Sequence, residues 1–565
     1  MSNICHQNLI YKGTLDISQL LNSDGFKIII LSLVLTLASF LIQGNIGISL
    51  GDEGFLWYGT IQTALGKIPL RDFQSYDPGR YYWCAAWSAL LGPGIMSLRL
   101  SVAIFQFAGL CFGLLTLRRI IRSWVMLSLS GFLLLIWMHP RHKFFEPSIA
   151  MGAVYFAVRL IENPSLRQHY ISGIFVGIAA FFGRNLGGYS FLSFFLLIIF
   201  IWYRNTAIEL GKDLLEKYNI HGKSLPSSIS IVFKRLYKRK VNPGKRISSW
   251  LAGIVTGYLP MIIMMILIPG FFDSVMDMIF VILRFGHTNM PIPIPWPWCF
   301  DYSQMSMMES LRKFLAGTFY IFLPLFYLVI SVNILTTAND LKHNTVFIAV
   351  LFVGLIFMHY PFSCADFPHI TQSVHPFIIG LLSLPYIFNY NKILRYGLFG
   401  VIFIITFILA GFIQPYYQKT IAQQHEFVSY NIAGDTLWIK KSSANLIDTV
   451  QQVNKQKVQE NEGLFLVPGW STFYPILQRD APLWNIYFII PETDERQEEM
   501  IKELITENVN WVILGDVPFG DLDILRFKNT HQILWRHFMD NFKPVPTKGL
   551  PDNYQLLHRK PGQIR

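Results

Sequence analysis

The sequence predicts a polytopic α-helical membrane protein, with about eleven spans and a small C-terminal α/β domain outside the cytoplasm. Three observations lead to this fold class. Hydrophobic residues make up 52% of the 565 residues, and the mean hydropathy is +0.39, values typical of polytopic membrane proteins. Apolar runs near span length recur from residue 26 to residue 413. From about residue 414 the composition becomes that of a soluble domain. The chain is therefore divided into residues 1–413 and 414–565.

The expected spans are apolar segments near the length of about 20 residues that crosses the hydrocarbon core of a bilayer, although a few are short. Residues 1–25 are polar, so the first apolar run is expected to be a signal anchor and not a cleaved signal peptide. The segments lie near residues 26–43, 95–117, 122–138, 147–161, 170–183, 186–203, 249–269, 315–335, 345–360, 370–388 and 395–413.

Lysines and arginines between the spans predict the orientation, because cytoplasmic loops carry an excess of both. With eleven spans, the strongly basic loops share one face, which is predicted to be cytoplasmic together with the N-terminus. The chain is then expected in the inner (plasma) membrane. The net charge of +12 is attributed to topology and anionic lipid, and nucleic acid is not expected as a partner. The basic positions are Arg118, Arg119, Arg122, Arg167, the loop from Arg204 to Arg246, Lys342, Lys392 and Arg395.

The polar segments fall on the opposite, outer face. The first is a loop at residues 44–94, in which Trp83–Leu91 is predicted to be a short interfacial helix, since it is too short to cross. A loop at Gly270–Lys313 contains the proline- and tryptophan-rich run Pro291–Trp298, which predicts irregular chain at the membrane boundary. The turn His139–Glu146, the hinge Gly183–Asn185 and the segment Tyr360–His369 complete this face.

The C-terminal part is predicted to be an α/β unit. Gly463–Val467 and Asn510–Leu514 are apolar runs typical of buried strands, and the polar segment Asp494–Asn508 between them is typical of a helix. Strand, helix and strand in this order favour a small α/β fold. One apolar stripe of the helix is expected to contain Met500, Leu504 and Ile505.

Two kinds of site are not indicated. The C-terminal part has no glycine-rich loop of the GxGxxG or GxxxxGK type, which argues against nucleotide binding. The five cysteines show neither CxxC nor metal-ligand spacing, so neither a zinc site nor a disulfide framework is predicted.

The acidic pair Asp52–Glu53, directly after the first span, is the strongest candidate for chemistry. Desolvation near the apolar slab disfavours the charged form of a carboxylate, which suits a general base. Neighbouring residues project in different directions, so one of the two is expected to face a substrate, and which one stays open. The alternative is an ordinary solvated loop beside a span.

At this point the chain resembles a known family, the GT-C glycosyltransferases, which are integral membrane enzymes. Their first outer loop carries an acidic pair or an Asp-containing motif just after the first span, matched here by Asp52–Glu53. The resemblance extends to the number of spans and the soluble C-terminal domain. It is nearest to the branch of protein O-mannosyltransferases and the aminoarabinose transferase of lipid A. It implies sugar transfer from a polyprenyl-phosphate donor to an envelope glycan, lipid or protein, at the surface of the lipid bilayer.

The resemblance also implies roles for particular residues. Asp52, or Glu53, would take the proton of the acceptor hydroxyl, and cations would hold the departing phosphate. For Arg71 a structural ion pair is favoured, and Glu146 is expected to cap a helix or act as a second carboxylate. No Asp-x-Asp metal site is evident, so no metal residues are assigned and a divalent cation is one possibility. The phosphate-binding candidates are Arg80, Arg141, His142, Lys143, Arg184 and His369, the last also a partner for a relay with Asp366; each could instead contact headgroups. Tyr81, Tyr82 and Trp83 are candidates for acceptor or sugar contacts, or for interfacial anchoring.

Two other functional classes remain open. A transporter or flippase of lipid-linked glycans would be expected to show internal repeats and broken spans in paired positions, and the sequence has no convincing repeat. A membrane scaffold with a partner-binding C-terminal domain is the third class. The transporter or flippase class gives no reason for the acid pair at Asp52–Glu53 or for an outer α/β domain.

Overall fold

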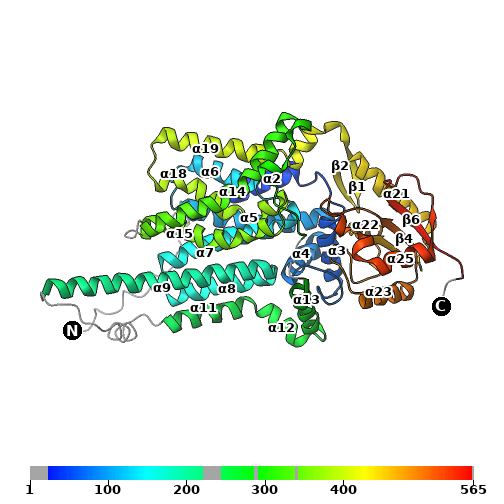
Figure 1. Cartoon of the computed structure of the whole chain (residues 1–565), viewed down its shortest axis with the longest axis horizontal. Coiled ribbons are helices and arrows are strands. Elements are labelled where there is room, and N and C mark those ends of the chain that lie inside the picture. The colour runs from blue at the N-terminus through cyan, green and yellow to red at the C-terminus, as the bar shows by residue number, and fades with distance from the viewer. Residues whose placement is uncertain (1–22, 221–242, 286–289, 337–340, 563–565) are drawn as a thin grey trace, which may run out of the picture.

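A helical body and a C-terminal domain lie end to end in the computed structural model of the chain, which describes residues 23–220, 243–285, 290–336 and 341–562. Figure 1 shows the long helices side by side at one end and the strands at the other. The short helices α3 (Asp52–Ala64) and α4 (Pro78–Leu91) lie at the end of the body that faces the C-terminal domain.

Each of the eleven predicted spans coincides with one helix or with one bent pair of helices, which confirms the predicted fold class. Among the described residues, seven helices are long and apolar enough to cross a membrane, or nine spans if each bent pair counts as one. The two remaining positions hold α6 and α8, of 13 and 17 residues. The single helices are α2 (Asp24–Gln43), α5 (Ile95–Leu117), α6 (Trp124–Ile136), α7 (Phe145–Glu162), α8 (Leu166–Phe182), α9 (Arg184–Ile220), α14 (Met307–Thr336), α15 (Leu341–Phe357) and α19 (Lys392–Thr406).

Proline explains the position of both bends. Helix α11 (Pro243–Gly257) meets α12 (Leu259–Leu267) at 57°, and α17 (Phe367–Ser373) meets α18 (His375–Ile387) at 62°. Each second helix has a proline, Pro260 or Pro376, in its first turn. A proline is tolerated in the first turn of a helix, because the N–H that it lacks would have no partner within that helix. Its ring, however, clashes with the last turn of the preceding helix, so the two helices cannot form one continuous helix.

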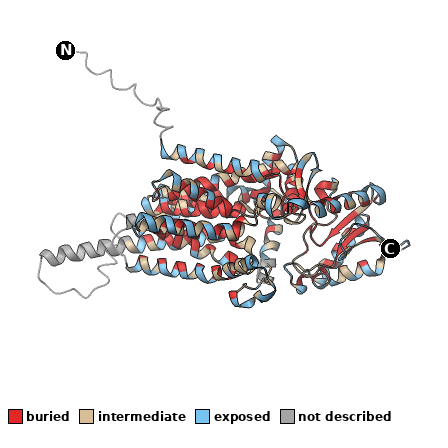
Figure 2. Cartoon of the chain, turned by 90° about the horizontal axis from the view of Figure 1, so that it is seen from above, coloured by how far each residue is buried: buried red, intermediate tan, exposed pale blue. Residues whose placement is uncertain are grey.

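The outer faces of the body are apolar. Val34 and Leu41 of α2 are 57% and 71% exposed, and Ile393 of α19 is 85% exposed. Buried residues fill the middle of the body and the inside of the C-terminal domain (Figure 2). Apolar faces of this extent suit contact with lipid, where every backbone polar group is bonded within its own helix.

Glycines let two of these helices approach closely. Gly173 and Gly177 of α8 face Gly253 and Gly257 of α11, each pair spaced four residues apart on one side of its helix. A Cβ on any of the four would overlap backbone of the partner helix. This small-residue spacing is typical of helix pairing in membranes, where backbone contact and dispersion replace the hydrophobic effect.

Three expected loops contain helix. The outer loop at residues 44–94 includes α3 and α4, and the second of these begins before the expected Trp83–Leu91. The loop at Gly270–Lys313 begins with α13 (Phe271–Phe285), although Pro291–Trp296 is irregular as predicted. The loop from Arg204 to Arg246 begins as a continuation of α9, and its basic cluster at 234–240 lies outside the described residues. Helices α3, α4 and α13, of 13 to 15 residues, are too short to give the signal of a span, and the extension of α9 is polar.

The C-terminal domain has the predicted strand–helix–strand unit at its centre. Strand β3 (Gly463–Val467) pairs in parallel with β4 (Val509–Gly515), and α23 (Asp494–Thr506) connects them. Met500 and Leu504 are buried as expected, but Ile505 is 42% exposed, because it lies a further 100° around the helix. The sheet order is β3-β4-β6-β5, and the strands not predicted are β5 (Phe542–Val545), β6 (Tyr554–Arg559) and the hairpin of β1 (Phe427–Ile432) and β2 (Asp435–Lys440).

The C-terminal domain docks on residues 44–94 of the body. Backbone N–H of Gly47 donates to Trp438, and the side chain of Gln62 in α3 donates to Asp480 at 2.7 Å. Gln74 also forms hydrogen bonds with the C-terminal domain through both its backbone and its side chain. The predicted grouping of residues 44–94 with the C-terminal domain on one side of the body is therefore observed.

Candidate functional site

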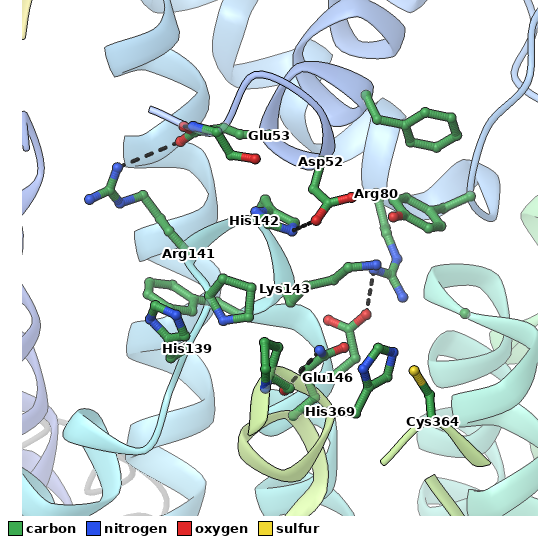
Figure 3. A pocket seen from close by; sticks show the side chains of 18 of the residues that line it. Asp52, Glu53, Arg80, His139, Arg141, His142, Lys143, Glu146, Cys364 and His369 are labelled. Carbon is green, nitrogen blue, oxygen red and sulfur yellow. Dashed lines mark hydrogen bonds and ion pairs between the residues drawn. The ribbon is translucent and has the colours of Figure 1, made fainter. Parts of the chain in front are cut away.

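One cavity of about 620 Å³ lies where the helical body meets the C-terminal domain. The starts of α3, α4 and α9, the turn before α7 and the segment before α17 form its walls, and the C-terminal domain adds Tyr487, Ile489 and Ile490. The fold thus gathers segments that are up to 440 residues apart in sequence. The predicted residues that line the cavity are Asp52, Glu53, Arg80, Arg141, His142, Lys143, Arg184 and His369, most of them drawn in Figure 3.

Asp52 presents its carboxylate to the cavity. Asp52 was expected in a loop, but it is the first residue of helix α3. The N-cap residue of this helix is Gly51, which has no side chain that could cap it. The positive end of the helix dipole favours a negative charge at this position. The side chain is 48% exposed, and its Oδ2 lies 3.9 Å from Nε2 of His142 (Figure 3). This is an accessible carboxylate near a possible proton partner.

Glu53 has a different environment. Its side chain is 6% exposed, and Nε and Nη2 of Arg99 each lie 2.8 Å from one of its oxygens. Burial alone would raise the pKa of Glu53, but the charge and hydrogen bonds of Arg99 outweigh burial and lower that pKa to about 2. The carboxylate expected to share the chemistry of Asp52 is therefore occupied by an ion pair. Arg99 was missed, and its signal was an arginine inside an apolar span.

Arg141 supports this ion pair. Its Nη1 lies 3.6 Å from Oε1 of Glu53, while its Nη2 donates to the carbonyl oxygens of Gln43 and Ile46 at 2.9 and 3.1 Å. These bonds tie the turn before α7 to the end of α2. Arg141, expected to bind phosphate, therefore uses the donors of its Nη2 inside the protein, although its side chain lines the cavity.

Arg80 and Glu146 form a second buried ion pair. Nη1 of Arg80 lies 2.7 Å from Oε1 of Glu146, and Nε of Arg80 donates to the carbonyl of Phe182. Glu146 is in the first turn of α7, as a capping residue would be, but its charge is paired. Its Oε2 is buried and has no hydrogen-bond partner among the described atoms. The pair connects α4, α7 and the end of α8 at one wall of the cavity.

Lys143 is a cation without an acidic partner. Its ammonium lies 3.8 Å from the ring centroid of Tyr76, and no carboxylate of the described chain forms an ion pair with it. Both side chains line the cavity. A lysine in this setting holds its charge against an aromatic face and keeps N–H donors free for an anion.

His142, beside it, is buried, and its Nε2 has no hydrogen-bond partner in the described part of the chain. His142 and Lys143 are therefore available to a ligand in a way that Arg80 and Arg141 are not.

Arg184 and His369 both line the cavity, and each is paired with an aspartate. The backbone N–H of Arg184 donates to Oδ2 of Asp77 at 2.9 Å, and its Nε lies 3.3 Å from Oδ1 of the same residue. Nδ1 of His369 lies 2.6 Å from Oδ1 of Asp366. Asp366 is the N-cap of α17 and also accepts the backbone N–H of His369. The expected pairing of Asp366 with His369 is therefore present, as part of a helix cap.

Cys364, Asp366 and His369 are also a group that could hold a metal ion, because their ligand atoms lie within 4.8 Å of one another. The oxygen of Asp366 that faces His369 already accepts two hydrogen bonds. Burial, and then the charge of Asp366, raise the pKa of Cys364 to about 12, which disfavours the thiolate that binds metals. As observed, the group is a hydrogen-bonded cap, and a divalent cation remains a prediction.

The three aromatic residues expected to contact sugar do not line the cavity. Tyr81 is fully buried, and its hydroxyl accepts the backbone N–H of Tyr76. Trp83 packs against Phe105 and donates to the carbonyl of Ser101, and Tyr82 is 36% exposed elsewhere. Arg80 is the residue of α4 that faces the cavity. Because neighbouring residues of a helix point in different directions, the three residues that follow it point away from the cavity. The aromatic residues that line the cavity are Phe55, Tyr76, Phe144, Tyr360 and Tyr487, and none of them was predicted as a sugar contact. Arg71 forms the expected ion pair, with Asp72 at 2.7 Å.

No protein-family model matches the chain, and no curated protein sequence matches it significantly. Among solved structures, the oligosaccharyltransferase AglB from Archaeoglobus fulgidus, in complex with an inhibitory peptide and a dolichol-phosphate, is 12% identical, with a TM-score of 0.46 over 96% of this chain and 75% of AglB. ArnT from Cupriavidus metallidurans, bound to undecaprenyl phosphate, is 11% identical, with a TM-score of 0.49 over 95% of this chain and 98% of ArnT.

Proposed function

We propose that the chain is a membrane glycosyltransferase, which moves a sugar from a polyprenyl-phosphate donor to an acceptor on the side of its C-terminal domain. One observation carries the proposal. The half-exposed carboxylate of Asp52 and the ammonium of Lys143 face one cavity at the junction between an apolar helical body and a polar domain. A lipid-linked donor and a polar acceptor can meet at such a junction.

In the proposed reaction, Asp52 is the general base. The acceptor hydroxyl attacks the anomeric carbon of the sugar and gives its proton to Asp52. The bond from that carbon to the phosphate oxygen breaks as the new glycosidic bond forms. The phosphate leaves as a stable anion, so that a cation and not an acid is required opposite it. His142, 3.9 Å from Asp52, is placed to receive the proton afterwards.

Lys143 is proposed to hold the departing phosphate. Its ammonium lies against Tyr76 and has no carboxylate partner among the described residues, so its charge is available to an anion. Arg80 and Arg141 surround the same space but are committed to Glu146 and to backbone carbonyls. They would contribute positive potential to the cavity more than direct bonds.

Apolar residues also line the cavity and would suit the first isoprene units of the donor. Met278 and Met290 approach from the segments around α13, and Ile489 and Ile490 from the C-terminal domain. The acceptor is proposed to be an envelope glycan, lipid or protein. The protein is proposed to lie in the inner (plasma) membrane, with the C-terminal domain outside the cytoplasm.

The test is turnover by the Asp52→Asn protein. The assay follows release of undecaprenyl phosphate from a panel of undecaprenyl-phosphate-linked sugars, in liposomes that contain an envelope extract as acceptor. A general base contributes roughly 10²- to 10⁴-fold, so turnover should fall by about that factor. Asp523→Asn is the control, because Asp523 is an exposed carboxylate of the C-terminal domain that pairs with Arg526 outside the cavity.

Unchanged turnover in Asp52→Asn would overturn the proposal. Movement of the intact donor across the liposome membrane, without release of undecaprenyl phosphate, would instead support the transporter or flippase class.

A further inference from the structure

The turn that precedes Asp52 is held by the C-terminal domain. The carbonyl oxygens of three successive residues, Ser49, Leu50 and Gly51, accept hydrogen bonds from Ser471 and Thr472. The distances are 2.8 Å from Oγ1 of Thr472 to Ser49, 3.1 Å from its backbone N to Leu50, and 2.7 Å from Oγ of Ser471 to Gly51. A helix start without a side-chain cap is thereby fixed from another domain.

Tyr487 of the same domain lies directly over this turn. A Cβ built on Gly51 would be 3.2 Å from Cε2 of Tyr487 and 3.7 Å from its hydroxyl oxygen. The ring also meets Phe55, one turn further along α3, with centroids 6.0 Å apart. Tyr487 and Asp52 both line the cavity. The phenol hydroxyl is therefore placed beside the residue that carries the proposed base.

Gln74 fixes the backbone that carries Tyr487. Its Oε1 accepts the N–H groups of Ile486 and Tyr487, both at 2.9 Å, and its Nε2 donates to the carbonyl of Tyr487 at 3.2 Å. Its own backbone N–H donates to Trp484 at 2.8 Å. Gln74 thus makes four hydrogen bonds with this segment. They fix the position of its backbone relative to the cavity, and with it the position of the phenol group of Tyr487.

The electrostatics agree with this placement. Burial first, and then the charge of Asp52, raise the pKa of Tyr487 well above its ordinary value. Tyr487 therefore stays a neutral hydrogen-bond donor at any physiological pH. The other groups that face Asp52 are His142, Lys143 and Tyr76.

We propose that Tyr487 is a positioning residue for Asp52: its hydroxyl donates to the carboxylate and directs the other oxygen toward the acceptor. The C-terminal domain would then be part of the active site and not an appendage. The catalytic role of Tyr487 in this inference rests on the proposed function. The contact itself can be tested without turnover.

The first experiment measures the reactivity of Asp52 in the full-length protein. A water-soluble carbodiimide with an added amine modifies carboxyl groups in their protonated form, and mass spectrometry reports each site. The proposed hydrogen bond would hold one carboxylate oxygen of Asp52 away from the reagent, so Tyr487→Phe should raise the labelling rate of Asp52 several-fold under fixed conditions. Glu53, buried against Arg99, should remain unlabelled in every folded variant.

The matched control is Tyr430→Phe, which removes another phenol that donates to a carboxylate of this domain, Asp448, outside the cavity. It should leave the labelling of Asp52 unchanged. Gly51→Ala crowds the same contact, because its new Cβ would lie 3.0 Å from the carbonyl oxygen of Gly469 and 3.2 Å from the ring of Tyr487, and the resulting shift should raise the labelling too. Equal labelling of Asp52 in the wild type, Tyr487→Phe and Gly51→Ala would overturn the inference, whatever the activity.

The second experiment is a double-mutant cycle in the turnover assay. Loss of one hydrogen bond to a charged group should lower kcat of Tyr487→Phe by about 10- to 100-fold, with KM for the donor nearly unchanged. The double variant, Asp52→Asn with Tyr487→Phe, should turn over no more slowly than Asp52→Asn alone, because the two changes remove the same function. Additive losses would mean that Tyr487 acts independently of Asp52, against the inference. Full turnover in Asp52→Asn would instead refute the proposed function.

Discussion

Glu53 and Arg99 form a two-pronged ion pair inside the protein, with two Arg99 nitrogens each 2.8 Å from a Glu53 oxygen. Arg99 also donates to the carbonyl oxygens of Gly44 and Gly47, so that one side chain joins α5, the end of α2 and the start of α3. Because Glu53 follows Asp52 in a helix, locking Glu53 inward directs Asp52 toward the cavity. The ion pair between Glu53 and Arg99 therefore helps to position Asp52 in the site.

We expect Glu53→Gln to destabilise the protein strongly. Removing one partner of a buried pair leaves the other charge uncompensated, at a typical cost of about 3–5 kcal/mol. Thermal unfolding of the detergent-solubilised protein measures the effect. Glu162→Gln is the control, since Glu162 pairs with Arg119 at the surface, where an ion pair contributes up to about 1 kcal/mol. Equal stability of the two variants would contradict a structural role for Glu53.

The same pair predicts a pH dependence. Burial opposes the charge of Glu53, but Arg99 prevails and lowers the pKa of Glu53 to about 2, below the usual value near 4.3 for an unfolded chain. Its stabilisation is therefore complete above about pH 5 and is lost as the pH falls toward 2. The difference in Tm between wild type and Glu53→Gln should narrow over this window. A constant difference down to pH 3 would contradict the assignment.

Lys143 and Arg141 are expected to differ in what their loss affects. Lys143→Gln should raise the apparent KM for the lipid-linked donor by about 10- to 100-fold, the value of a hydrogen bond to a charged group, with little change in Tm. Arg141→Gln should instead lower Tm, because it breaks the bonds to Gln43 and Ile46. Lys67→Gln, at an exposed pair, is the control. An unchanged KM in Lys143→Gln would remove Lys143 from the donor site.

The orientation can be checked by cysteine labelling in whole cells. In a background without Cys5 and Cys299, an impermeant maleimide should reach Ser429→Cys, which is exposed in the C-terminal domain, from outside. Arg167→Cys, exposed at the start of α8, should react only after the cells are opened, because its loop is predicted to be cytoplasmic. Labelling of both from the same side would contradict the predicted topology.

Local sequence patterns predicted the parts of the fold that depend on local physics. A span requires a minimum run of apolar residues whatever its neighbours are, so all eleven helical positions could be read from hydropathy. The unit of β3, α23 and β4 was predicted from its apolar runs and helical period for the same reason. The hairpin of β1 and β2 and the strands β5 and β6 were missed, because short half-buried strands depend on packing partners that are distant in sequence.

Hydropathy and composition alone indicate a membrane-embedded helical body with an appended α/β domain, and they predict Asp52 and a set of cations at the boundary between the two. Which of these charges remain available depends on the packing of distant segments. Glu53 is paired with Arg99, and Arg80 with Glu146, whereas Asp52 and Lys143 keep accessible charges. Charge pairing depends on distances of 3 to 4 Å between segments far apart in the chain, and that information is absent from any local pattern. For the same reason no run of residues around Tyr487 could show that the C-terminal domain closes over Asp52.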